Sequence, residues 1–269
     1  MILKEPHRIE LNTDALALQA AVVPWDSEVF GCPVASISQI EIKSDQRQAV
    51  QADFDRFRHW LDAQAIGIAS CRLPHDRLHA SMLLEHNDFK FIEMVLHPIM
   101  RLDTSPMMET ILSTETGLVV AQADEDDLSV LTSLAGQAFG YERYHVDPRL
   151  DSSVANLRYA RWVKNSFCDP KQRLLKIALD GQIVGMFVVE NTADNTAYWH
   201  LTAVHPDFQG RQLGYRAWVA MIQYHQRAGI SSVCTTITAR NSRVLGLYAK
   251  LSFRFTEPDM TFHWVRSEA

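Results

Sequence analysis

The chain of 269 residues is predicted to fold as an α/β (α+β) protein, with a mixed, mostly antiparallel sheet flanked by helices. Two patterns predict this class. Short runs rich in aromatic and β-branched residues alternate with longer runs whose apolar residues recur at helical spacing. In addition, Asp180-Gly181 separates two strand-like runs, and such a pair favours a tight hairpin between antiparallel strands.

We expect two domains, 1–105 and 117–269. The join at 103–117 is polar, contains Pro106 and lacks a sustained period, as expected of a connector. The N-terminal domain is expected to be a smaller α/β domain. Its predicted strands lie at 34–42 and 66–72, and its predicted helices at 46–64 and 77–86.

The C-terminal domain is expected to begin with a strand at 117–123. A helix then opens at Asp124, where acidic residues suit a helix N-terminus. The remaining elements are a helix at 152–167, strands at 173–179, 182–190 and 196–204, a helix at 213–227, a strand at 231–237, a helix containing Tyr248, and closing strands at 253–255 and 260–265.

Residues 204–214 are interpreted as the end of a strand, a tight turn at Gly210 and the first turn of a helix. The leading N–H groups of a helix have no intrahelical partner and carry part of the positive end of the helix dipole. A diphosphate fits such a position. The P-loop pattern and the three-glycine dinucleotide fingerprint are both absent from this segment.

This turn resembles the Gln/Arg-x-x-Gly-x-Gly/Ala motif of the GCN5-related N-acetyltransferases (GNAT), which holds the pyrophosphate of acetyl-CoA. Gln209 and Gly214 match its ends, whereas Gln212 replaces the central glycine, and Gly210 supplies backbone flexibility nearby. The resemblance implies a GNAT fold for the C-terminal half and acetyl-CoA as cosubstrate. It assigns cofactor binding to Thr202, Ala203, Val204, Gln209, Gly210, Arg211, Gln212, Leu213, Gly214, Tyr215 and Asn241.

A second motif, at 241–253, resembles the late helix of the same family, in which an Asn begins the helix and a Tyr follows two turns later. The spacing places Asn241 and Tyr248 on one helical face. The resemblance implies that Tyr248 is the general acid for the departing thiolate. Structural roles stay open for both residues, since Asn is a preferred N-cap and a tyrosine can be part of the core.

The N-terminal half contains a weak copy of this late segment. Residues 83–91 and the run after them loosely repeat residues 247–255 and their own downstream run. This predicts a degenerate half-copy of the GNAT fold, in which Leu83 or Leu84 replaces the tyrosine and no phosphate turn precedes it. We expect this domain to bind no cofactor and to contribute to the acceptor site.

Further segments, at 25–31, 138–145 and 159–162, are similar to the bacterial TDP-fucosamine acetyltransferase family. Its members acetylate the 4-amino group of a nucleotide-linked amino sugar, so the resemblance implies a small-molecule amine of this kind as acceptor. The aromatic residues that could stack on a base or sugar, or belong to the core, are Trp25, Phe30, Tyr141, Tyr144 and Trp162.

Amide formation at a thioester requires a neutral amine, so a base must take a proton from it. His200 is the preferred candidate because imidazole titrates near neutral pH. The alternatives are His205, Glu190 and His145, and strand alternation leaves the direction of His200 open. An N–H near Ala203 or Val204 is expected to hold the oxyanion. No nucleophile motif is present, which favours direct transfer in a ternary complex.

Composition excludes several other classes. A net charge of −6 and a pI of about 6.0 argue against a nucleic-acid partner. The absence of a long apolar run predicts no membrane association and a cytoplasmic location. The four cysteines form no Cys-x-x-Cys pair, so neither a disulfide framework nor a metal site is expected.

Other functions stay open at this point. The amine could instead belong to a polyamine, an antibiotic, an amino acid or a protein N-terminus. The chain could also be a non-catalytic acetyl-CoA-binding module, or an interaction protein that binds no acetyl-CoA. A homodimer formed through edge strands is possible but is not required by the sequence.

Overall fold

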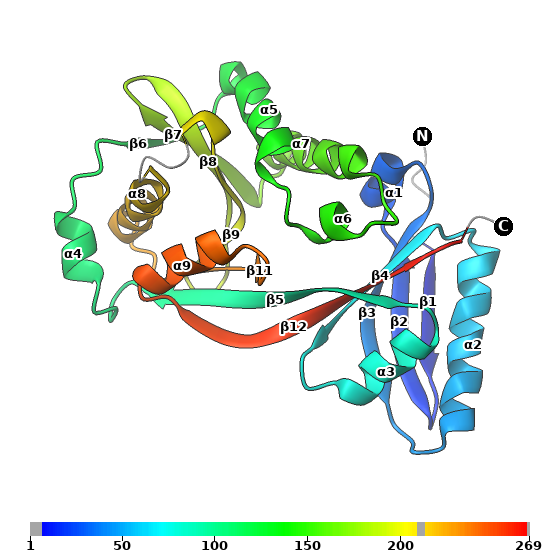
Figure 1. Cartoon of the computed structure of the whole chain (residues 1–269). Helices are drawn as coiled ribbons and strands as arrows, with labels where there is room; N and C mark the ends of the chain where they lie inside the picture. Colours follow the sequence, from blue (N-terminus) through cyan, green and yellow to red (C-terminus); the bar gives the residue numbers. More distant parts are fainter. Residues whose placement is uncertain (1–6, 209–212, 268–269) are drawn as a thin grey trace. The chain divides into compact units, whose positions relative to one another are not determined.

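The computed structural model describes residues 7–208 and 213–267 (Figure 1). The chain forms two compact units: unit 1 holds the described residues up to Met94, Asp147–Arg149 and the residues from Pro258 on, and unit 2 holds the rest. Two boundaries between the units fall inside strands, β5 (Lys90–Arg101) and β12 (Arg254–Val265). The chain therefore passes between the units along extended strands. The division into the domains 1–105 and 117–269, each with its own functional role, stays a prediction.

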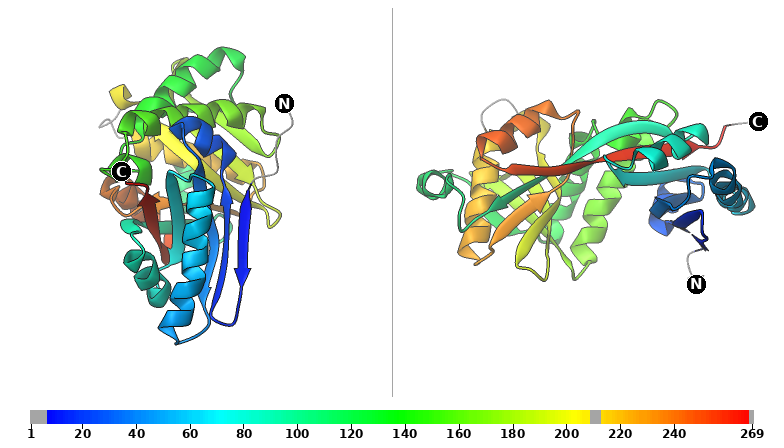
Figure 2. Two further views of the ribbon diagram at one scale, coloured as in Figure 1. Left: turned by 90° about the vertical axis from the view of Figure 1, so that its right-hand side faces the viewer. Right: turned by 90° about the horizontal axis from the view of Figure 1, so that it is seen from below.

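Unit 1 contains a five-stranded sheet in the order β1-β2-β3-β4-β12. Only β3 and β4 are parallel neighbours among the described strands of this sheet. Two helices, α2 and α3, pack on one face of this sheet, and Figure 2 shows α2 lying along the strands. The elements are β1 (Arg8–Asn12), β2 (Leu16–Val22), α1 (Pro24–Phe30), β3 (Val34–Ile42), α2 (Arg47–Ala63), β4 (Ile68–Pro74) and α3 (Leu78–His86).

Unit 2 contains a sheet in the order β5-β10-β9-β8-β7-β6, with β11 also paired to β5. Only β9 and β10 are parallel neighbours among its described strands. The predicted mixed, mostly antiparallel sheet is therefore confirmed. The elements are α4 (Met108–Ser113), β6 (Val119–Gln122), α5 (Leu128–Ala138), α6 (Arg143–Val146), α7 (Ser152–Cys168), β7 (Gln172–Leu179), β8 (Gln182–Asn191), β9 (Thr196–Val204), α8 (Leu213–Arg227), β10 (Ser232–Thr235), β11 (Ile237–Thr238) and α9 (Ser242–Lys250).

The sheet of unit 2 is covered on both faces. Successive strand residues point to opposite faces, and they enter different clusters: Phe187 packs with α8 and α9, whereas Met186 and Val188 pack with α5 and α7. We call these the α8/α9 face and the α5/α7 face, and the helices are visible on the two sides of β7–β9 in Figure 1. Side chains on the α8/α9 face and side chains on the α5/α7 face are separated by the sheet, so only side chains on the same face can contact one another.

The two units share one topology. In each, an antiparallel meander leads to a parallel pair joined by a helix, β3-α2-β4 in unit 1 and β9-α8-β10 in unit 2. In each unit, the strand after the next helix pairs with a strand of the other unit's sheet. The strand β5 follows α3 and pairs with β10, while β12 follows α9 and pairs with β4. Leu84, fully buried in α3, has the place along its helix that Tyr248 has in α9. The predicted half-copy is confirmed.

Several predicted elements need correction. The segment at 103–117 contains the short helix α4, because Met108 and Ile111 bury one apolar face. The strand predicted at 231–237 is interrupted at Thr236, and the two closing strands are one strand, β12. The sequence interpretation also missed β1, β2 and α1, although α1 carries the aromatic residues Trp25 and Phe30.

His225 on α8 is fully buried among the apolar residues of the α8/α9 face. Its Nε2 accepts a hydrogen bond from the indole N–H of Trp199 at 3.0 Å, so Nδ1 carries the ring proton, and among the described residues Nδ1 has no partner. Burial, and to a lesser extent Arg173, lowers the pKa of His225 to about 4.

This burial predicts a loss of stability in acid. The unfolded chain binds a proton at His225 near pH 6.5 and the folded chain only near pH 4, so folding stability falls as the pH drops between these values. We expect about 2 kcal/mol of the unfolding free energy to be lost between pH 7 and pH 5 from this group. Urea unfolding of wild type and His225→Gln at both pH values measures it. Equal losses in the two proteins would contradict the assignment.

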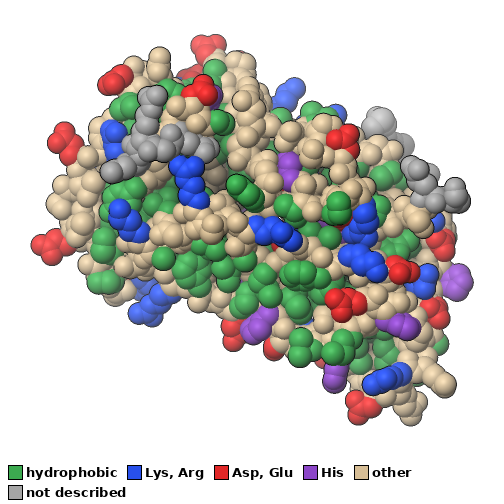
Figure 3. Space-filling model, in the orientation of Figure 1, with side chains coloured by type: hydrophobic (Ala, Val, Ile, Leu, Met, Phe, Trp, Pro, Cys, Tyr) green, Lys and Arg blue, Asp and Glu red, His purple; other side chains and the backbone are tan. Residues whose placement is uncertain are grey.

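Exposed apolar side chains occur on α3 and β5 of unit 1. Leu78, Met82 and Phe91 are 56%, 61% and 46% exposed. The space-filling view shows apolar side chains gathered over this part of the surface (Figure 3). Large exposed apolar patches are typical of contact surfaces, and the homodimer considered from the sequence stays a prediction.

Candidate functional site

The parallel strands β9 and β10 of unit 2 pair over only part of their length. Their register ends at Trp199 and Thr235, and β9 then continues to Val204 with β8 as its partner. After Thr236 the chain pairs with β5 instead, through β11. The two strands therefore part at the centre of the sheet.

A β-bulge marks the point of parting. Leu201 lies opposite Val188, and Trp199 opposite Val189, so His200 is an extra residue in β9. The bulge reverses the alternation of the strand. Trp199 packs on the α8/α9 face, whereas Leu201, two residues later, packs on the α5/α7 face. An unbroken strand would have placed both on one face.

The backbone of β9 beyond the bulge has a defined direction. His205 donates its N–H to the carbonyl of Val184, on the β8 side. Because N–H groups alternate along a strand, the N–H of Ala203 also points toward β8, whereas those of Thr202 and Val204 point toward the side that β10 has left. Of the two groups expected to hold an oxyanion, Val204 has the matching direction, and its role stays a prediction.

Tyr248 of α9 lies on the α8/α9 face at this parting. Its side chain is 1% exposed and packs edge-on against Trp218 and Phe253. Burial raises the pKa of Tyr248 to about 12, although the polar groups of Trp218, Thr202 and Thr235 lie close enough to lower it in part. The hydroxyl therefore lies between the two strands that separate, and it stays protonated at neutral pH. Thr235 and Trp218 were not anticipated from the sequence.

His200 lies on the opposite, α5/α7 face. Its Nε2 is 2.8 Å from Oε2 of Glu190 on β8, and the two side chains are 20% and 33% exposed. The imidazole also contacts the rings of Tyr198 and Trp162, with ring centroids 4.7 and 6.1 Å apart. The bulge thus settles the direction that strand alternation left open.

The two predicted catalytic side chains consequently lie on opposite faces of one sheet. A direct contact between them is not expected, because β9 lies between them. A reactive group placed in the gap between β9 and β10 would have the Tyr248 hydroxyl on one side and the His200–Glu190 pair on the other. This arrangement suits acyl transfer through a tetrahedral intermediate, because a base and a hydrogen-bond donor would lie on different sides of the same carbonyl group.

The predicted phosphate cradle is described only in part. Gln209, Gly210, Arg211 and Gln212 lie outside the described residues. The helix α8 begins at Leu213, as predicted. A Cβ on Gly214 would meet Leu247 at 3.9 Å, so the packing of α9 leaves room there for a small side chain. The ammonium nitrogen of Lys250 lies over the ring of Tyr215, 4.6 Å from the ring centroid.

Asn241 caps α9. Its side-chain oxygen accepts a hydrogen bond from the N–H of Val244 at 3.3 Å, which is the structural role considered from the sequence. Its predicted part in cofactor binding is compatible with this cap, because the amide also has two N–H donors. That part stays a prediction.

The alternative bases have other surroundings. Nδ1 of His205 accepts from the N–H of Asp207 at 3.3 Å, in the turn after β9. Nε2 of His145 is 2.8 Å from Oδ1 of Asn156, and burial lowers the pKa of His145. The carboxylate near His205 is that of the exposed Asp207, at 3.8 Å, and His145 lies on α6, so His200, at the point where β9 and β10 part, remains the best-placed imidazole.

The aromatic candidates differ in burial. Tyr144 is fully buried beneath Arg143 and Arg158, which makes it a core residue, whereas Tyr141 is 57% exposed. Trp162 is partly exposed and donates to Gln172 at 3.4 Å. Among these aromatics with described contacts, Trp162 is the one that reaches His200.

A hollow on the surface of unit 2 lies away from these groups. It has a volume of about 520 Å³ and is lined by the 114–120 segment, Leu112 and the residues Ala220, Gln223 and Arg227 of α8. None of the predicted site residues that the structure describes lines it. We therefore assign it no part in the site.

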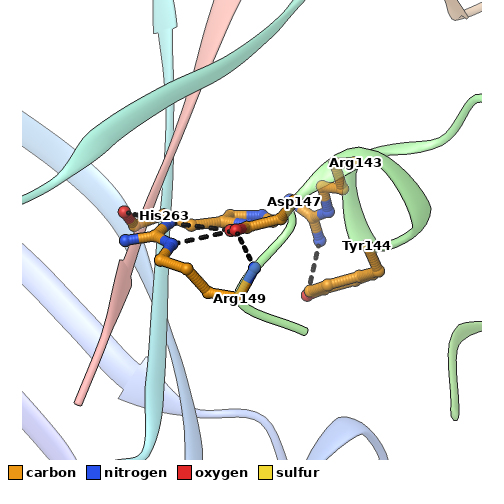
Figure 4. Close-up of polar contacts among 5 residues, drawn as sticks. All are labelled: Arg143, Tyr144, Asp147, Arg149 and His263. Carbon is orange, nitrogen blue, oxygen red and sulfur yellow. Dashed lines mark hydrogen bonds and ion pairs between the residues drawn. The ribbon is translucent and has the colours of Figure 1, made fainter. Parts of the chain in front are cut away.

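A buried polar cluster in unit 1 was not anticipated from the sequence. Arg149 pairs with Asp147 through two nitrogens at 2.9 and 2.7 Å, and Nδ1 of His263 on β12 is 3.0 Å from the same carboxylate (Figure 4). Burial alone would raise the pKa of Asp147, but hydrogen bonds from Arg149 and His263 hold it well below its usual range. The cluster fixes residues 147–149 to β12.

Every helix within residues 7–208 and 213–267 is too short or too polar to span a membrane.

Comparisons with known proteins concern the family and the fold of the chain. Residues 132–253 match the model of the acetyltransferase (GNAT) family. The spore coat polysaccharide biosynthesis protein SpsD of Bacillus subtilis (strain 168) is 19% identical over 251 residues, which cover 91% of this chain and 82% of SpsD.

Solved structures show the same fold. A GCN5-related N-acetyltransferase from Sphaerobacter thermophilus matches 96% of this chain and 84% of its own, with a TM-score of 0.66 and 13% identity. A tandem GNAT protein from the clavulanic acid biosynthesis pathway matches 95% of this chain and 80% of its own, with a TM-score of 0.64 and 16% identity. The match to the acetyltransferase (GNAT) family thus covers residues 132–253, the segment that carries the parted strands and α9.

Proposed function

We propose that this protein is an N-acetyltransferase that transfers the acetyl group of acetyl-CoA directly to the primary amine of an amino sugar. The observation that carries the proposal is the parting of β9 from β10, with the Tyr248 hydroxyl on one side and the His200–Glu190 pair on the other. Acetyl-CoA is the acetyl donor typical of the family. We place the reaction in the cytoplasm, as the sequence predicts.

In the proposed reaction the thioester lies in the gap between the strands. His200 takes a proton from the amine, whose lone pair attacks the carbonyl carbon. The N–H of Val204 stabilises the developing oxyanion. The leading N–H groups of α8, together with residues 209–212, hold the pyrophosphate.

Tyr248 stabilises the departing thiolate chiefly by donating a hydrogen bond. A thiol has a pKa of about 8.5, whereas burial raises the pKa of Tyr248 to about 12. Complete transfer of the phenol proton to the thiolate would therefore be uphill by about 5 kcal/mol. A donated hydrogen bond needs no such transfer, and the high pKa keeps the donor in place throughout neutral pH.

The acceptor is proposed from the relatives and from Trp162. SpsD is named for spore coat polysaccharide biosynthesis, and one structure with a TM-score of 0.65 and 9% identity is described as a glucosamine N-acetyltransferase region. Trp162 is partly exposed beside His200, and aromatic faces suit the apolar face of a sugar ring. A nucleotide-linked amino sugar is the proposed form of the acceptor.

The test is a screen for acetyl-CoA-dependent thiol release. Nucleotide-linked amino sugars, free amino sugars, polyamines, amino acids and an N-terminal peptide would each be offered with acetyl-CoA. We expect release with the nucleotide-linked amino sugars at least tenfold above the other amines. Release with polyamines or peptides alone would overturn the acceptor class. Calorimetry without detectable acetyl-CoA binding would overturn the whole proposal.

A further inference from the structure

Glu190 contacts one of the two ring nitrogens of His200. Its Oε2 is 2.8 Å from Nε2 of the imidazole, although the residue of β9 that lies directly opposite Glu190 is Tyr198. The bulge makes this contact possible. It inserts His200 as an extra residue of β9 directly after Trp199, the last residue of β9 that pairs with β10. A carboxylate on β8 and an imidazole on β9 are thus brought together at the point where β9 parts from β10.

This contact fixes where the ring proton lies. An ionised carboxylate only accepts hydrogen bonds, so the nitrogen that faces it must be the donor. Nε2 of neutral His200 therefore carries the proton, and Nδ1 carries the lone pair. A histidine acts as a base through its unprotonated nitrogen, and the position of that nitrogen is set by the hydrogen bond that the other one makes.

Other contacts hold the ring itself. The rings of Tyr198 and Trp162 pack against the imidazole. The Tyr198 hydroxyl is in turn 3.1 Å from Oγ1 of Thr236, the residue that interrupts the strand after β10. Removal of the carboxylate would consequently change the proton distribution on His200 more than the place of its ring.

We infer that Glu190 is a positioning residue, which holds His200 in the Nε2–H form so that Nδ1 accepts the proton of the attacking amine. The inference rests on the proposed acetyl transfer. In the step, an N–H bond of the amine breaks and an Nδ1–H bond forms, while the amine lone pair makes the C–N bond. The C–S bond breaks and its electrons leave with sulfur. Glu190 stabilises the imidazolium and keeps its own charge throughout.

The test is a double-mutant cycle of Glu190→Ala and His200→Gln, with Asn191→Ala as control. Asn191 is the next residue of β8, exposed and bonded to Arg173 rather than to the site. We expect Glu190→Ala to lower kcat by about tenfold to a hundredfold with an unchanged KM for acetyl-CoA, and to have less than a twofold effect when His200 is already Gln. Glu190→Asp should restore part of the rate. Asn191→Ala should keep wild-type turnover.

A second readout does not depend on turnover. Ring ¹⁵N chemical shifts of His200 should show the Nε2–H form in wild type and a mixture of both forms in Glu190→Ala. Equal losses in kcat with and without His200, or unchanged ring shifts, would overturn the inference. If no amine releases thiol, the proposed function fails, and the ring shifts still decide whether Glu190 sets the tautomer.

Discussion

Tyr248→Phe is expected to lower turnover by about tenfold to a thousandfold while acetyl-CoA affinity changes less than twofold. The substitution removes one hydroxyl that lies near Thr202 and Thr235, between the strands that part. The ring is fully buried and packs on Trp218 and Phe253, contacts that phenylalanine keeps. Because the thiolate forms only as the C–S bond breaks, the lost hydrogen bond affects the transition state more than the bound substrate.

Steady-state kinetics with the best acceptor and calorimetric titration with acetyl-CoA check this result. Tyr224→Phe is the matched control, since Tyr224 lies on α8 and packs against His225, away from the parted strands. It should keep wild-type turnover. An unchanged kcat in Tyr248→Phe would show that this tyrosine is a core residue with no part in the reaction, the alternative left open from the sequence.

The sequence predicted the elements that carry the cofactor side of the site. The helix at 213–227 and the strand at 196–204 were predicted with the bounds that the structure shows. Both have strong local signals: a run of aromatic and β-branched residues, then apolar residues at helical spacing. The helix that carries Tyr248 could be predicted because its motif lies within one element.

The acceptor side of the candidate site was harder to predict from the sequence. A bulge adds a residue without changing composition, so the run around His200 is indistinguishable from a regular strand, and the direction of the imidazole could not be predicted. The pairing with Glu190 depends on the register between β8 and β9. Register is set by the packing of both faces, which a single sequence does not display.

The sheets that β5 and β12 join could not be predicted for a similar reason. The weak repeat of 83–91 with 247–255 predicted a half-copy of the fold, but the sequence does not say which sheet β5 and β12 join. Likewise Asp147 and His263 are far apart in the chain, and neither is part of a local motif. Their contact arises only because β12 enters the sheet of unit 1.

Arg149→Met is expected to lower the free energy of unfolding by about 3 kcal/mol or more at pH 7. The side chain of Asp147 is completely buried, and Arg149 supplies two hydrogen bonds to its carboxylate. Removal of Arg149 leaves a buried charge with His263 as its remaining side-chain partner in the cluster. Desolvation of a charge is costly when its counter-charge is missing, whereas loss of an exposed pair is not.

Urea unfolding measures the effect, with Arg56→Met as the matched control. Arg56 pairs with Asp53 on α2 of the same unit but is 58% exposed, so its loss should cost less than about 1 kcal/mol. The double variant Arg149→Met/Asp147→Leu should recover much of the lost stability, because no charge is then buried. Equal costs for Arg149→Met and Arg56→Met would contradict this account.

The same carboxylate gives the prediction a pH dependence. Because the folded pKa of Asp147 is held below its usual value, its contribution is fully present above about pH 4 and is lost as the pH falls toward the folded value. Asp147→Leu should therefore lose less stability than wild type between pH 5 and pH 3, whereas removal of a surface carboxylate with an unshifted pKa would leave this loss unchanged. His225 lowers the stability of the folded chain between about pH 6.5 and pH 4, which overlaps the upper part of this range. A comparison of His225→Gln with and without Asp147→Leu separates the two groups, since the first acts mainly above pH 4 and the second below it.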